Sequence, residues 1–289
     1  MATLREIRQR IASVKSTQQI TKAMKMVAAA KLRRAQENIV AIRPYAYDLR
    51  DLIAHLSQID QSEVNLDLMI KRPVEKVLIV AVAADRGLCG GFNSNIVRSV
   101  LERIAQYKDT EYELYTIGRK NSEFFGKRDY PIFSAKQNFF NHLSFEDALE
   151  ISRTLISAYT SEKFDRIEIV YNEFKSAIQQ NLITETFLPF TVDESNNEEY
   201  HAVDYIYEPD VKSILSTVIP KHLNVQIWRI LLESNAAEQG ARMTAMDSAT
   251  ENAEEIKSKL TLHYNRARQA AITTELNEIV GGAEALKES

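Results

Sequence analysis

The chain has 289 residues and a mass of 33.0 kDa, enough for one large domain or two small ones. Its 45% hydrophobic and 26% charged residues are typical of folded globular proteins. A formal net charge of −4 argues against a dedicated nucleic-acid-binding protein, because such proteins are usually basic. The single cysteine, Cys89, excludes an intramolecular disulfide and indicates a reducing compartment. The longest strongly apolar run, 77–84, is too short to cross a bilayer.

Residues 1–58 are predicted to form one long helix. No glycine or proline precedes Pro44, and both residues are costly inside helices. Thr3 and Glu6 have the spacing of a capping box, in which each side chain bonds to the backbone amide of the other residue. Apolar residues then recur every three or four positions, in a stripe as narrow as the seam of a coiled coil. We expect Pro44 to kink this helix, which then resumes.

Between residues 74 and 207 the pattern changes to strands that alternate with helices. Nearly continuous apolar runs are typical of parallel strands that are buried on both faces. The expected strands are 76–83, 111–117, 166–171, 182–190 and 200–207. The expected helices are 95–107 and 145–159, the second with Ser144 as its N-cap. This alternation predicts a doubly wound, Rossmann-like α/β domain.

Residues 209–289 are predicted to form a second long helix, since only Gly240 interrupts the stretch between Pro220 and Gly281. The first 50 residues carry 11 Lys and Arg against 3 Asp and Glu, whereas 209–289 carry 9 against 11. A basic helix beside a mildly acidic one is favoured over two basic helices, which would repel each other. The predicted fold class is therefore α/β: a long antiparallel coiled coil of the N- and C-terminal helices, with the Rossmann-like domain inserted between them.

The loop that follows the first expected strand is the main candidate for a ligand site. Its residues are Asp85, Arg86, Gly87, Leu88, Cys89, Gly90 and Gly91. Glycines at this place can bring backbone amides to a phosphate, but the loop matches neither G-x-G-x-x-G nor the phosphate-loop pattern. A structural turn or a partner-contact loop is favoured over a nucleotide pocket. A helix start lowers the pKa of a nearby thiol, but no histidine lies close to Cys89 in sequence, so a structural role is favoured there too. The five histidines show no metal-ligand spacing.

Several segments resemble the gamma subunit of F-type ATP synthases, bacterial type. The resemblance is carried by 20–31 (ITKAMKMVAAAK), 232–253 (which begins LESNAAEQ) and 268–283 (RQAAITTELNEIVGGA). The loop 85–93, the triplet Gly118-Arg119-Lys120, Leu188-Pro189 and the stretch 205–209 are also similar to the family. These segments cover essentially the whole chain in the order of the family, which makes the resemblance specific.

The resemblance implies a non-catalytic central rotor-stalk subunit that couples ion-driven rotation of a membrane ring to ATP synthesis and hydrolysis at the beta subunits. The implied partners are the hexamer of alpha and beta subunits, an epsilon-type subunit and the ring of c subunits, with no nucleic acid, no cofactor and no membrane span of its own. Because no transit peptide is recognised, we expect a peripheral protein on the cytoplasmic face of a bacterial cell membrane. The paired cysteines of chloroplast-type members are absent, so no thiol switch is expected.

Individual roles follow only from positions that match the family. The residues implied to contact or couple to the beta subunits are Met24, Arg242, Arg268, Gln269, Thr273 and Glu275. Those implied at the shaft tip are Ile279, Val280 and Leu286. The loop 85–91 would belong to the foot domain.

Two alternatives come from other classes of protein. A flavodoxin-like enzyme would use the loop 85–93 and would bind nucleotide or flavin tightly as an isolated chain. A stand-alone coiled-coil scaffold would associate with itself and need no alpha or beta subunits. Neither alternative explains why both ends of the chain match one family.

Overall fold

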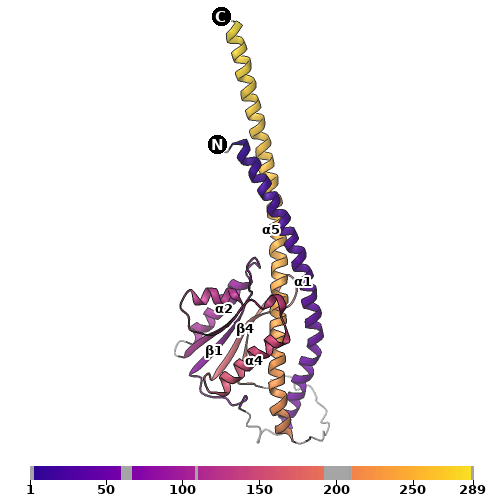
Figure 1. The fold of residues 1–289 in the computed structure, drawn as a ribbon, viewed down its shortest axis with the longest axis vertical. Helices are drawn as coiled ribbons and strands as arrows, with labels where there is room; N and C mark the ends of the chain where they lie inside the picture. The colour runs from indigo at the N-terminus through magenta and orange to yellow at the C-terminus, as the bar shows by residue number, and fades with distance from the viewer. Residues whose placement is uncertain (1–2, 60–66, 108–109, 192–207, 209, 288–289) are drawn as a thin grey trace. The chain divides into compact units, whose positions relative to one another are not determined.

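A computed structural model gives the placement of residues 3–59, 67–107, 110–191, 208 and 210–287 (Figure 1). The chain forms two compact units: unit 1 is Met1–Val27 with Met243–Ser289, and unit 2 is Ala28–Arg242. Two long helices contribute to both units, α1 (Leu4–Ile59) and α5 (Val211–Lys287). The predicted strand 200–207 lies outside the described residues. The bounds of the three predicted domains stay a prediction.

Unit 2 contains a five-stranded sheet. Its strands are β1 (Lys76–Val82), β2 (Glu111–Ile117), β3 (Ile132–Lys136), β4 (Arg166–Phe174) and β5 (Gln180–Leu188). The spatial order is β3-β2-β1-β4-β5, and β1 lies parallel to both β2 and β4. Only β5 runs antiparallel, to β4, at one edge. The chain moves outward from β1 to β3 and then returns to the other side of β1, which confirms the doubly wound, Rossmann-like prediction.

Four shorter helical segments lie in the described part of unit 2. They are α2 (Phe92–Gln106), α3 (Arg119–Gly126), the 3-10 turn η1 (Phe140–His142) and α4 (Phe145–Thr160). The predicted N-cap of α4 is confirmed, because the Ser144 hydroxyl accepts from the amide of Asp147 and the Asp147 carboxylate accepts from the amide of Ser144. The Asp147 carboxylate also suits the positive end of the helix dipole.

The side chains of β1 divide between two cores. Val77, Ile79 and Ala81 pack on one face of the sheet with apolar residues of α2 and α3. Leu78, Val80 and Val82 pack on the other face, with α4 and with the parts of α1 and α5 that belong to unit 2. Successive strand residues point to opposite faces, so a strand covered on both faces must be apolar throughout. This requirement explains the uninterrupted apolar run of the sequence.

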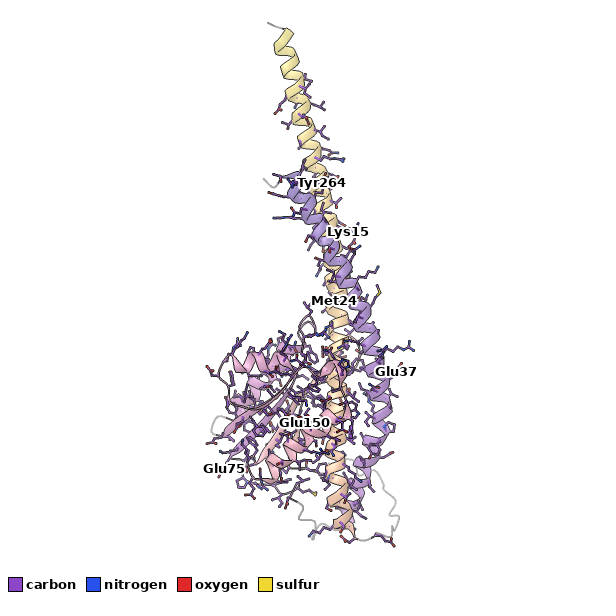
Figure 2. All side chains as sticks on the ribbon, viewed as in Figure 1. Lys15, Met24, Glu37, Glu75, Glu150 and Tyr264 are labelled. Carbon is purple, nitrogen blue, oxygen red and sulfur yellow. The ribbon has the colours of Figure 1, made fainter. Side chains whose placement is uncertain are left out.

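In unit 1 the first turns of α1 run beside part of α5. Lys25 pairs with Asp247 at 2.5 Å, the Thr250 hydroxyl donates to the Thr21 hydroxyl at 2.8 Å, and the Gln18 amide donates to Glu254. The partner number falls as the α1 number rises, so the two segments are antiparallel, as predicted. Figure 2 labels Lys15, Met24 and Tyr264 on these two helices.

The start of α1 also follows the sequence prediction. The Thr3 amide donates to the Glu6 carboxylate at 3.1 Å, and the Glu6 amide donates to the Thr3 hydroxyl at 3.3 Å. Pro44 and Pro220 both lie inside continuous helices. None of the helices in the described part of the chain is long and apolar enough to span a membrane.

Candidate functional site

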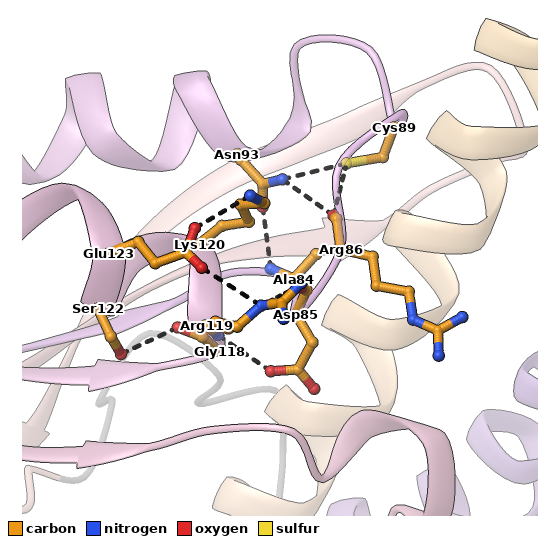
Figure 3. A network of polar contacts seen from close by, with 10 residues as sticks. All are labelled: Ala84, Asp85, Arg86, Cys89, Asn93, Gly118, Arg119, Lys120, Ser122 and Glu123. Atoms are coloured by element: carbon orange, nitrogen blue, oxygen red, sulfur yellow. Dashed lines mark hydrogen bonds and ion pairs between the residues drawn. The ribbon is translucent and has the colours of Figure 1, made fainter.

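The loop after β1 is anchored by Asp85, whose side chain is buried. Its carboxylate accepts three backbone N–H groups: Arg119 at 3.0 Å, Asn138 at 2.8 Å and Phe140 at 3.2 Å. Asp85 thus joins the end of β1 to the start of α3 and to the segment after β3; Figure 3 shows its place beside Arg119. With its oxygens committed to backbone amides, Asp85 acts here as a structural anchor.

Asn93, in the first turn of α2, fixes the rest of the loop. Its side-chain oxygen accepts from the Ala84 amide at 3.0 Å, and its side-chain nitrogen donates to the Arg86 carbonyl and the Cys89 sulfur, both at 3.3 Å (Figure 3). Leu88 and Gly90 both have positive φ angles, 63° and 58°. These bonds and angles describe a tight turn that leaves the side chains of Arg86 and Leu88 exposed.

Cys89 is buried in this turn beside Ala84, Phe92 and Ala237. Burial raises the pKa of its thiol, and the nearby Arg242 guanidinium opposes that rise only in part. The thiolate is the reactive form of cysteine, so the thiol is poorly suited to be a nucleophile at neutral pH. The structural interpretation made from the sequence is the one that this environment supports.

Cys89 in the folded chain should therefore resist alkylation. We expect N-ethylmaleimide to react about 100-fold more slowly with the folded chain than with the chain unfolded in urea, because the thiol is both covered and protonated. The labelling rate should still increase with pH above about 8.5, the ordinary pKa of a thiol. Mass spectrometry over a pH series measures both effects. Rapid labelling of the folded chain at pH 7 would contradict this result.

Arg242 on α5 reaches the same loop. Its guanidinium pairs with Glu238 at 2.6 Å and donates to the Gly87 carbonyl at 3.2 Å, and only 11% of its side chain is exposed. Burial raises the pKa of the Glu238 carboxyl, while Arg242 favours the ionised form. Arg242 was assigned from the family to a beta-subunit contact, which stays a prediction. In this structure Arg242 clamps α5 to the loop.

The edge of the sheet where β1 and β4 end is the place at which doubly wound sheets bind ligands. Here Ala237 of α5 packs against Ala84, Cys89 and Phe92, with Phe174 of β4 beside them. A segment of the chain's own helix therefore occupies the place that a nucleotide or flavin takes in an enzyme of this fold. This packing disfavours the flavodoxin-like alternative.

The other predicted contact residues belong to unit 1. Met24 is half-buried on α1, whereas the remaining residues of this group lie on α5 with exposed side chains: Arg268, Gln269, Thr273 and Glu275. The Thr273 hydroxyl donates to the Gln269 carbonyl of its own helix at 2.9 Å. Ile279 and Val280 are 62% and 56% exposed. Leu286 lies within α5, but its side chain is outside the described residues.

A buried charged residue that the sequence reasoning did not single out is Glu233 of α5. Its carboxylate accepts from the Arg43 guanidinium of α1 at 3.2 Å and from the Phe174 amide of β4 at 3.1 Å. One feature of the sequence could have revealed it. Glu233, Ala237 and Gly240 are three or four positions apart, so a charged residue shares one stripe of the helix with two small residues. An acid on such a stripe is buried only if it has partners.

Comparison with known proteins agrees with this architecture. The family model described as ATP synthase matches residues 3–286. A relative from Chloroherpeton thalassium, named ATP synthase gamma chain, is 50% identical over 303 residues and covers 100% of both chains. The chain belongs to the ATP synthase gamma-chain family. The prediction of a non-catalytic stalk subunit of an F-type ATP synthase is thereby confirmed.

Two solved structures are similar to this gamma chain. One is from the central stalk and c-ring of the Tetrahymena thermophila mitochondrial ATP synthase, with 25% identity and a TM-score of 0.60 over 80% of this chain and 99% of that one. The other is from the Euglena gracilis mitochondrial ATP synthase, with 24% identity and a TM-score of 0.70 over 98% of this chain and 94% of that one. The likeness to the second confirms the fold.

Proposed function

We propose that this gamma chain is the rotating shaft of its ATP synthase and that its exposed C-terminal stretch is the part that acts on the beta subunits. The observation that carries the proposal is the exposure of α5 over 268–280. Along this stretch the helix presents Ile272, Leu276, Ile279 and Val280 with about half or more of each side chain in solvent. Exposed apolar side chains at this density mark a surface that partners cover.

The coupling follows from shape. A single helical shaft cannot offer the same face to three identical beta subunits, so each beta subunit meets a different set of side chains. A contact changes the affinity of a beta subunit for nucleotide only if it favours one conformation over another. Arg268, Gln269, Thr273 and Glu275 supply directional bonds for such contacts, and Met24 supplies an adaptable apolar contact.

The α/β domain of unit 2 is the proposed foot, which takes up rotation from the ring of c subunits and binds the epsilon-type subunit. The loop 85–91 belongs to this domain. The proposed location is the cytoplasmic face of a bacterial membrane, where the chain is held by its partners. ATP-driven proton transport by membrane vesicles with and without this chain tests the complete assignment.

The first test of the shaft is reconstitution with purified alpha and beta subunits. We expect fast ATP hydrolysis only when all three chains are mixed and none from the gamma chain alone, since its role is to bias the beta subunits. Hydrolysis by the isolated chain, or an unchanged rate when it is added to alpha and beta subunits, would contradict the proposal.

The double substitution Arg268→Ala and Gln269→Ala tests the proposed contacts directly. Each hydrogen bond to a charged group contributes about 1.5–3 kcal/mol, so we expect proton-coupled ATP synthesis to fall at least about tenfold. Both side chains are exposed, so the thermal unfolding of the isolated chain should not change. ATP synthesis in energised vesicles and circular dichroism measure the two quantities.

The matched control for the double substitution is Lys259→Ala, on the same helix. Lys259 pairs with Glu255 of its own helix, and both side chains are largely exposed. We expect wild-type synthesis from this variant. If the double variant synthesises ATP as fast as the control, Arg268 and Gln269 do not take part in the coupling contacts.

A further inference from the structure

We propose that Glu233 is a joint that fixes the sheet of the foot domain to both long helices, so that the three turn as one body. Its side chain is only 3% exposed and lies on α5. One carboxylate oxygen accepts from Arg43 of α1 and the other from the backbone amide of Phe174, at the end of β4. Figure 1 labels the three elements that meet at this carboxylate.

The contacts on either side of Glu233 follow the same face of α5. Two turns and one turn earlier, Gln226 and Arg229 donate to the Glu185 carboxylate of β5 at 3.0 Å and 3.4 Å. The Tyr171 hydroxyl of β4 donates to the same carboxylate at 3.1 Å. These positions and Glu233 are three or four residues apart, which places them on one stripe of the helix.

Further along this stripe, Gly240 lies against the β4–β5 connection. A Cβ atom at Gly240 would lie 3.1 Å from the carbonyl oxygen of Ala177. The glycine thus permits a close approach of that connection to the helix, which an alanine would crowd. The face of α5 from Gln226 to Gly240 is therefore built to fit the sheet edge.

Directional bonds are what make such a joint resist rotation. Apolar contacts between a helix and a sheet are non-directional, so a small slip costs little. A hydrogen bond weakens steeply when its angle departs from linearity, and a bond to a buried carboxylate is among the stronger ones. Slippage of the sheet would also take the Phe174 amide from the buried Glu233 carboxylate and leave one of its oxygens without that donor, which is costly. Glu233 bonds to both the sheet and α1, so it opposes movement of either one against α5.

This inference rests on the proposed rotation, and its test separates the two. The alpha and beta subunits of the assembled complex are fixed to a surface, and a bead attached to the α/β domain reports its angle. For Glu233→Ala we expect the variance of the angle at rest to rise at least twofold, because the foot is less tightly held. ATP hydrolysis should stay within twofold of wild type, since the substitution is remote from the exposed stretch 268–280.

Three more variants make the test specific to the joint. Glu233→Gln keeps the shape and one acceptor oxygen, so its variance should lie between those of wild type and the alanine variant. The exchange Arg43→Glu with Glu233→Arg restores opposite charges on α1 and α5, but an arginine cannot accept from the Phe174 amide. We expect the exchange to leave the variance high. Arg33→Ala is the control, because Arg33 pairs with Glu37 on the exposed side of α1, and it should match wild type.

Each possible result bears on either the joint or the rotation. If the angular variance of Glu233→Ala equals that of wild type, Glu233 is not a joint. Full recovery of the wild-type variance in the exchange variant would also overturn the proposal, because Glu233 would then act only as one half of an ion pair between two helices. No ATP-driven turning of the bead in the wild-type complex would instead overturn the proposed rotation. Raised variance in Glu233→Ala that persists in the exchange variant supports the joint.

Discussion

Gly118→Ala should strongly destabilise the α/β domain. Gly118 precedes α3 with φ +92°, a conformation that side chains with a Cβ rarely adopt. A Cβ at this position would lie 2.0 Å from the carbonyl oxygen of Ala83 and 2.7 Å from its carbon, and both are backbone atoms that cannot rotate away. The Gly118 amide also donates to the Lys136 carbonyl at 2.8 Å, which ties this turn to β3. Strain and overpacking together should cost at least about 3 kcal/mol.

Soluble yield and urea unfolding measure this effect. The only tryptophan, Trp228, packs edge-on against Phe145 within unit 2, so its fluorescence reports unfolding of that unit. Gly126→Ala is the matched control, since a Cβ there meets only the Ile132 side chain at an ordinary 3.8 Å. The control should be as stable as wild type or slightly more stable, because alanine loses less entropy on folding. A Gly118→Ala chain with the stability of the control would show that the turn adapts.

Arg103→Ala should destabilise the same domain by about 3–5 kcal/mol, the usual cost of leaving a buried charge without its partner. Glu168 of β4 is buried, and Arg103 of α2 donates to both of its oxygens at 2.5 Å. The Tyr107 hydroxyl adds a third bond at 2.7 Å. The Glu168 hydrogen bond raises the pKa of Arg103 further above its usual value, so the guanidinium is charged at every working pH.

Thermal unfolding followed by Trp228 fluorescence should show a fall of about 10 °C in Tm for Arg103→Ala. Arg103→Lys should recover only part of it, because a lysine cannot form the two-pronged bond. The control is Lys76→Gln, which breaks the exposed Lys76–Glu111 pair and should leave Tm unchanged. Arg166 also lies near this carboxylate, with its guanidinium 3.8 Å from a Glu168 oxygen. A loss as small as that of the control would mean that Tyr107 and Arg166 suffice to stabilise the buried Glu168.

The sequence predicts the sheet best where a strand is buried on both faces. The apolar run at 111–117 coincides with β2, and 76–83 exceeds β1 by one residue. The same reasoning missed β3, because an edge strand is only half-buried and can carry Ser134 and Lys136. It also missed α3, whose first turn holds Arg119, Lys120 and Asn121 and has too few residues to show a helical period.

The sequence predicted where the candidate site lies, but not which hydrogen bonds hold it together. The glycines mark the turn after β1, whereas the partners of Asp85 are backbone amides 34 to 55 residues away. Backbone amides carry no signature in the sequence, so nothing local distinguishes an anchoring carboxylate from a reactive one. Glu233 was missed for the same physical reason, since Arg43 is 190 residues distant and Phe174 contributes its amide rather than its ring.

The packing of Ala237 against the end of β1 has a consequence for biosynthesis. The sheet strands leave the ribosome before α5, yet both the core around Leu78 and the cluster around Cys89 include residues of α5. Until that helix has been translated, one face of the nascent sheet is covered only in part, by α1 and α4, and the remainder is open to aggregation or to chaperones. The final folding of unit 2 is therefore delayed until nearly the whole polypeptide has been made, and a truncated product that ends before α5 is a natural substrate for quality control.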